Sequence, residues 1–71
     1  MLDDGTYDVV VVDADTEGDV AALELTIIAG RHKGELVTVR AVGLRGESYE
    51  LLGVPGTLVV TNGEPSVRLE S

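Results

Sequence analysis

Short runs of β-branched residues separated by glycines recur along the whole chain and constrain its fold more than any other feature. Valine, isoleucine, threonine and tyrosine are frequent in these runs, nine glycines punctuate the chain, and no window shows a long apolar period of 3.6 residues. This pattern is typical of a mostly β protein. With 71 residues, 44% of them hydrophobic, the chain is expected to form one folded domain over residues 1–71.

Five segments are predicted as strands. Four consecutive valines in the first indicate burial on both faces, as in a strand of a closed barrel. The second alternates, so that Leu23, Leu25 and Ile27 share one face. The predicted strands are Thr6 to Asp13, Val20 to Ala29, Glu35 to Val42, Thr57 to Thr61 and Ser66 to Glu70.

The connections also carry local signals. Gly30 to Gly34 (GRHKG) reads as the hairpin between the second and third strands. Gly46 to Gly53 (GESYELLG) has an N-cap candidate, early acids and a closing glycine, which predicts one short helical turn. Asn62-Gly63 tolerates the positive φ of a tight turn, and Pro65 is placed just before the last strand.

Three strands, a short helix and two further strands is the element order of the OB-fold, a small five-stranded Greek-key barrel. The sequence therefore predicts an all-β, OB-like barrel with one short helix between the third and fourth strands. An SH3-like barrel is the alternative, and in it the helical turn would lie between the last two strands.

The opening of the chain resembles small phage and prophage OB-type proteins of the single-strand-binding type. The resemblance covers about the first forty residues and rests on G-x-Y-x-V-x-V (Gly5, Tyr7, Val9, Val11), on LELTI and on G-x-x-K-G (Gly30, Lys33, Gly34). It implies a nucleic-acid role with aromatic and basic residues on the barrel face. The chain departs from that pattern because Tyr7 and Tyr49 are its only aromatic residues apart from His32.

The stretch Asp13 to Glu24 (DADTEGDVAALE) has the ligand spacing of an EF-hand calcium loop. An EF-hand needs a helix on each side, whereas both flanks here read as strands. Glu24 would lie about 16 Å along its strand from Asp19, too far to close a cage around an ion. We therefore predict an acidic turn without a cofactor; the alternative is a calcium site of millimolar affinity formed by Asp13, Asp15, Glu17 and Asp19.

Charge is distributed unevenly along the chain. Eight acids and no base precede Arg31, whereas five acids balance five bases from Arg31 onward, and the net charge is −8. The acidic half repels phosphate groups and anionic membranes and suits a cationic partner. The loops that border the usual ligand face of an OB-fold would both carry acids here.

The basic residues suggest one alternative contact region. Four of the five Lys and Arg residues fall between residues 31 and 45, and glycines beside them would allow backbone N–H groups to approach a phosphate. The alternative interpretation is that these residues only form the polar tip of a hairpin, without a ligand. The candidate residues for an anion or nucleic-acid contact are Arg31, His32, Lys33, Arg40, Arg45, Tyr49 and Arg68.

Catalytic signals are weak. The chain has one histidine, no cysteine, no Walker loop and no H-E-x-x-H motif, and its paired acids are expected in solvated turns. We therefore expect a cytoplasmic, non-catalytic binding module, either a monomer or a homodimer, whose acidic loops suit a basic protein partner. Single-stranded nucleic-acid binding through the Arg31 to Arg45 region is the alternative, and cation binding by the acidic loop is the third reading.

Overall fold

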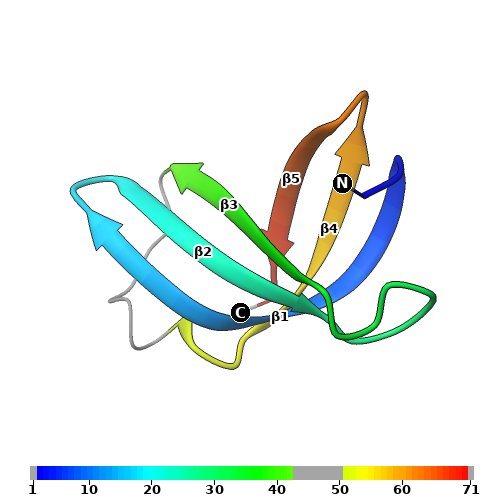
Figure 1. Cartoon of the computed structure of the whole chain (residues 1–71). Helices are drawn as coiled ribbons and strands as arrows, with labels where there is room; N and C mark the ends of the chain where they lie inside the picture. The colour runs from blue at the N-terminus through cyan, green and yellow to red at the C-terminus, as the bar shows by residue number, and fades with distance from the viewer. Residues whose placement is uncertain (1, 43–50, 71) are drawn as a thin grey trace.

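The structure is a computed structural model that describes residues 2–42 and 51–70. These residues form the strands β1 (Gly5–Glu17), β2 (Val20–Ile27), β3 (Leu36–Val42), β4 (Pro55–Thr61) and β5 (Glu64–Leu69). All neighbouring strands are antiparallel, in one sheet of order β3-β2-β1-β4-β5 (Figure 1). The predicted all-β architecture of five strands is confirmed.

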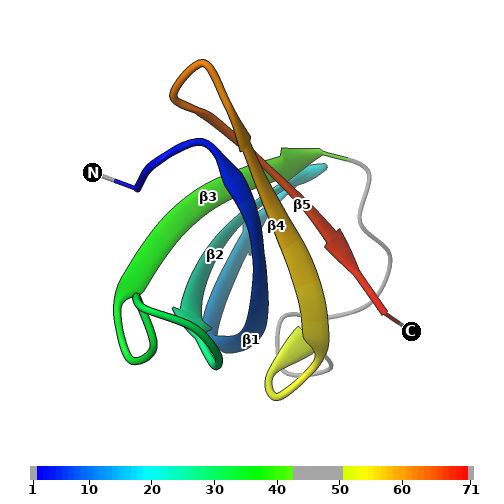
Figure 2. The same ribbon diagram turned by 90° about the vertical axis from the view of Figure 1, so that its right-hand side faces the viewer.

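The sheet curls into a half-barrel because β1 is long and belongs to both of its halves. The first part of β1 pairs with β4 and the second part pairs with β2. The register between β1 and β2 shifts between Val11 and Asp13, which is a β-bulge that bends the strand. As a result β4 and β5 cross in front of β2 and β3 when the molecule is seen from the side (Figure 2), and the edge strands β3 and β5 approach each other.

The apolar core lies inside this curl. On β2 the alternate residues Ala21, Leu23, Leu25 and Ile27 are buried, as the period of two predicts. No polar or charged residue is buried in the part of the chain that the structure describes. The buried residues are Val9, Val11, Ala21, Leu23, Leu25, Ile27, Val39, Leu51, Leu58 and Val60.

The valine run of β1 is buried on one face only, which corrects the expectation of burial on both faces. Val9 and Val11 are buried, Val10 is half-buried and Val12, at the bulge, is 45% exposed. The physical reason is that the sheet is a single curled layer. Its inner face meets the core and its outer face meets solvent.

Glycines with positive φ form part of the two hairpin turns. Asn62 (φ 52°) and Gly63 (φ 78°) form the tight turn between β4 and β5, with both values positive as a type I′ turn requires. At the β2–β3 connection, Gly34 has φ 94° and donates its N–H to the Ile27 carbonyl (2.8 Å), while the Ile27 N–H bonds to the Glu35 carbonyl (3.0 Å). This is the pattern of a G1 bulge, which favours glycine at its first position.

All five strands differ from their predicted bounds at one end or both, and the differences in β1 and β5 are the ones with structural consequences. β1 does not end at Asp13 but continues to Glu17, because it stays paired with β2, with Ala14 half-buried opposite Leu23 and the alternating acids in solvent. Pro65 lies within β5, not before it. There it pairs with Val60 at a position without ladder hydrogen bonds, on an edge strand, so its missing N–H costs nothing.

The predicted helical turn over Gly46 to Gly53 falls mostly in residues 43–50, which lie outside the described residues. Of its last three residues, Leu51 is helical and Leu52 and Gly53 form a turn. The end of that segment is tied to β1. The Gly53 N–H donates to the Val11 carbonyl (2.8 Å), and the Val11 N–H donates to the Val54 carbonyl (3.0 Å). These bonds bring the chain from β3 back to the side of β1, where β4 begins.

The segment before β1 supports the β4–β5 turn. The Asp4 carboxylate accepts the Asn62 N–H (2.8 Å) and the Gly63 N–H (3.1 Å). We expect Asp4→Ala to lower the free energy of unfolding by about 1 kcal/mol, since the freed N–H groups are exposed and bond to water instead. Chemical denaturation measures this, with Asp3→Ala as a control of equal charge. Equal effects of the two substitutions would contradict the role of Asp4.

Candidate functional site

The acids predicted to lie in a loop are arranged along a strand. Asp13, Asp15 and Glu17 occupy alternate positions of β1 and are exposed on the outer face of the sheet. Asp13 lies directly across from Glu24 of β2, whose side chain also points outward. We call Asp13, Asp15, Glu17 and Glu24 the acidic face.

Arg40 is the basic residue that lies beside the acidic face among the described residues. The strand register aligns Asp15 with Ala22 and Ala22 with Arg40. Arg40 of β3 is therefore two strands from Asp15, and only the small Ala22 side chain lies between them. A shallow hollow of about 450 Å³ lies over this region, lined by Asp15, Glu17, Val20, Ala22 and Arg40. Four carboxylates and one guanidinium leave this surface strongly negative.

The geometry of the acidic face does not gather its oxygens around one point. Side chains two residues apart on a strand are separated by about 6.6 Å, whereas calcium ligands converge within 2.6 Å of the ion. Within residues 2–42 and 51–70, no three His, Cys, Asp or Glu side chains are grouped so that they could hold a metal ion. Asp19 lies apart from the other three predicted ligands, in the turn after β1.

We therefore expect calcium to bind no better than to any exposed carboxylate. The backbone amide shifts of residues 13–19 should stay unchanged up to about 10 mM calcium, above the 10⁻⁴–10⁻³ M range of weak extracellular sites. Magnesium at the same ionic strength is the control. A saturable shift with calcium alone, centred on residues 15–19, would show that the loop reorganises into a site.

The predicted anion-contact residues are spread over the molecule. Arg31 and Lys33 are exposed at the tip of the β2–β3 connection. Arg40 lies about 16 Å from that tip, because it follows Glu35 by five residues of extended chain. Arg68 is on the outer face of β5, aligned through Thr57 with Asp8. The structure therefore does not bring these cations to one place, and Arg45 and Tyr49 lie outside the described residues.

His32 is engaged within the hairpin tip. Its ring contacts the Glu35 carboxylate through Nδ1 and meets the ring of Tyr7 edge-on, with a centroid separation of 5.8 Å. The hollow beside it, about 410 Å³, is lined by acids as well as by Arg31 and His32. An anion at this hollow would meet negative as well as positive side chains. Sequence spacing does not reveal this environment, because Tyr7 belongs to β1 and His32 to the β2–β3 connection.

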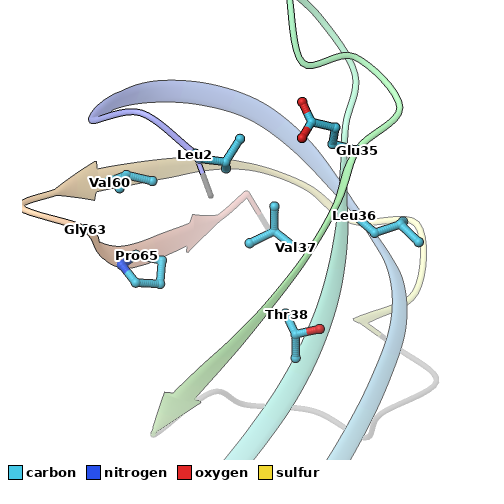
Figure 3. A pocket seen from close by; sticks show the side chains of 8 residues that line it. All are labelled: Leu2, Glu35, Leu36, Val37, Thr38, Val60, Gly63 and Pro65. Atoms are coloured by element: carbon cyan, nitrogen blue, oxygen red, sulfur yellow. The ribbon is translucent and has the colours of Figure 1, made fainter.

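A second surface feature has no signal in the sequence. A groove of about 300 Å³ runs between the first half of β3 and the β4–β5 hairpin (Figure 3). Leu2, Val37 and Val60 extend their side chains into the space between these elements, and Glu35 lies at one end. The groove exists because β3 and β5 are the two unpaired edges of the curled sheet.

The described residues offer no desolvated acid or base for catalysis, because none of their polar or charged side chains is buried. No helix among them is long and apolar enough to cross a membrane. No known protein family, curated protein or solved structure matches the chain.

Proposed function

We propose that this chain is an OB-like barrel that acts as a non-catalytic binding module for a basic polypeptide partner. The strand order supports the fold, because β3, β2 and β1 are consecutive hairpin neighbours and β4 returns to lie beside β1, which is a Greek key. An SH3-like barrel would place a helical turn between the last two strands. Here Asn62 and Gly63 alone connect β4 to β5.

The observation that carries the functional proposal is the acidic face. OB-folds use the outer surface around strands 2 and 3, together with the loops after strands 1 and 4, to bind their ligands. In this chain the outer face of β2 and β3 carries Glu24 and Arg40, and the end of β1 beside it adds the carboxylates of Asp13, Asp15 and Glu17. This surface attracts positively charged ligands and repels anions before they make contact.

A polynucleotide is disfavoured by the same surface. Phosphate contacts by Lys and Arg supply most of the affinity of non-specific nucleic-acid binding, and aromatic side chains supply the base stacking. The described cations are dispersed, and Tyr7 packs partly against the core. Single-stranded nucleic acid is therefore the alternative that the experiment must test.

The experiment measures fluorescence anisotropy with three labelled ligands: a lysine-rich peptide, single-stranded DNA and single-stranded RNA. We expect the peptide to bind at low salt and to weaken as salt rises, because screening acts on exposed charges. A variant that neutralises the acidic face (Asp13→Asn, Asp15→Asn, Glu17→Gln, Glu24→Gln) should lose about tenfold or more in affinity, since each exposed pair contributes up to about 1 kcal/mol.

The matched control neutralises four exposed acids elsewhere (Asp3→Asn, Asp8→Asn, Glu64→Gln, Glu70→Gln) and changes the net charge equally. Affinity for the peptide should then fall much less than with the first variant. Equal losses would show a general charge effect without a binding face. Micromolar binding of DNA or RNA by the wild-type chain, weakening with salt, would replace the proposal with the nucleic-acid function.

A further inference from the structure

The first half of β3 borders the groove with an unpaired backbone. In an antiparallel ladder, the residues that exchange hydrogen bonds with a neighbour alternate with residues whose N–H and C=O groups point away from it. The Ile27 N–H bonds to the Glu35 carbonyl, so Val37 pairs with Leu25 through hydrogen bonds. The backbone groups of Leu36 and Thr38 consequently point away from β2, toward the groove.

The facing edge cannot satisfy these groups in full. Pro65 of β5 lines the opposite wall of the groove and has no N–H to donate. Leu36 is 62% exposed at the same edge, and the apolar side chains of Leu2, Val37 and Val60 line the groove (Figure 3). An edge of this kind is a template for another strand.

The acidic side chains near the groove favour a positively charged partner. On the outer face, the strand register aligns Asp13 with Glu24 and Glu24 with Thr38. A strand added beside β3 would place an outward side chain next to Thr38, two strand spacings or about 9.6 Å from the position of Glu24 on β2. A Lys or Arg side chain lying across β3 would bring its charge toward the Glu24 carboxylate. The inward side chains of the same strand would face the apolar groove.

We infer that β3 binds an extended segment of a basic partner polypeptide by strand addition at Leu36 and Thr38, with basic side chains outward and apolar side chains in the groove. Main-chain hydrogen bonds would supply affinity, and the alternate side chains would supply specificity. This inference rests on the proposed function and specifies the form of the partner.

The test uses the full chain and a seven-residue peptide of alternating lysine and valine. Its matched control is the same peptide with alternate backbone amides N-methylated, which keeps the charge but removes donors to β3. We expect the first peptide to slow hydrogen exchange at the Leu36 and Thr38 amides by about tenfold or more, and the N-methylated peptide to bind at least about tenfold more weakly.

Thr38→Pro provides a second test within the protein. The substitution removes an N–H that points away from β2, so the hydrogen bonds between β2 and the edge strand β3 are kept. It should abolish the preference for the unmethylated peptide. Equal binding of both peptides to the wild-type chain, without protection of Leu36 and Thr38, would overturn strand addition and leave the acidic face as the binding surface. Binding of neither peptide would overturn the proposed function itself and this inference with it.

Discussion

Leu25→Ala is expected to lower the free energy of unfolding by about 2–5 kcal/mol, because the substitution removes a buried side chain and leaves a cavity. Leu25 is fully buried, and it lies in the strand register between Val11 of β1 and Val37 of β3. A domain of this length has about 4–11 kcal/mol of stability in total. The loss would therefore populate the unfolded state measurably at ordinary temperatures.

Urea denaturation followed by circular dichroism measures this effect. Leu36→Ala is the matched control, because it removes the same atoms from an exposed position of β3, and its cost should stay within about 0.5 kcal/mol. If both substitutions cost the same, the inner face of the sheet would not be the side on which the core packs.

Gly56→Ala is expected to cost about 1–3 kcal/mol through overpacking. Gly56 is buried in β4, and a Cβ at this position would lie 2.7 Å from the carbonyl oxygen of Arg68 and 2.9 Å from Cδ2 of Leu69. The nearest atom belongs to the backbone of β5, so a side-chain rotation cannot relieve the contact. The added methyl group would push β5 away from β4.

Thermal unfolding compares this variant with Thr57→Ala, which changes the next residue on the outer face of the same strand. The glycine variant should melt several degrees below wild type, as expected for a domain of this size. Thr57→Ala should stay much closer to wild type. A glycine variant that melts at the wild-type temperature would mean that β5 adjusts its position freely.

The parts of the fold that local sequence predicts well are those decided by local physics. The alternation in β2 places Leu23, Leu25 and Ile27 inside, because successive side chains of a strand point to opposite faces. Asn62-Gly63 forms the tight turn because these residues tolerate positive φ. The hairpin around GRHKG is equally local, since Gly34 supplies the φ value that its bulge requires.

The acids of β1 show where local reasoning failed. Asp13, Asp15 and Glu17 have low β propensity, and their density predicted a loop. In the structure the strand continues through them, because it stays paired with β2 as far as Glu17, with Ala14 half-buried and the acids in solvent. A period-two alternation of acids with small residues was the signal that could have identified this strand.

The predicted anion-contact residues were grouped by their closeness in sequence, and the structure separates the ones that it describes. Arg31, Lys33 and Arg40 are close in sequence, but extended chain separates residues quickly, and Arg40 ends up near Asp15 and away from the hairpin tip. Proximity in sequence groups side chains on a helix or in a compact loop. It does not do so along a strand.

The amino-acid sequence by itself determined that the chain is β, that Leu23, Leu25 and Ile27 share one face of their strand and that the first half of the chain is acidic, since these properties follow from residue type and a period of two. Only the tertiary structure decided that the acids share one face with Arg40 and that an apolar groove runs along β3. Both depend on strand register and on the curl of the sheet. These are set by a bulge in β1 and by pairing between segments far apart in the chain, which no local pattern records.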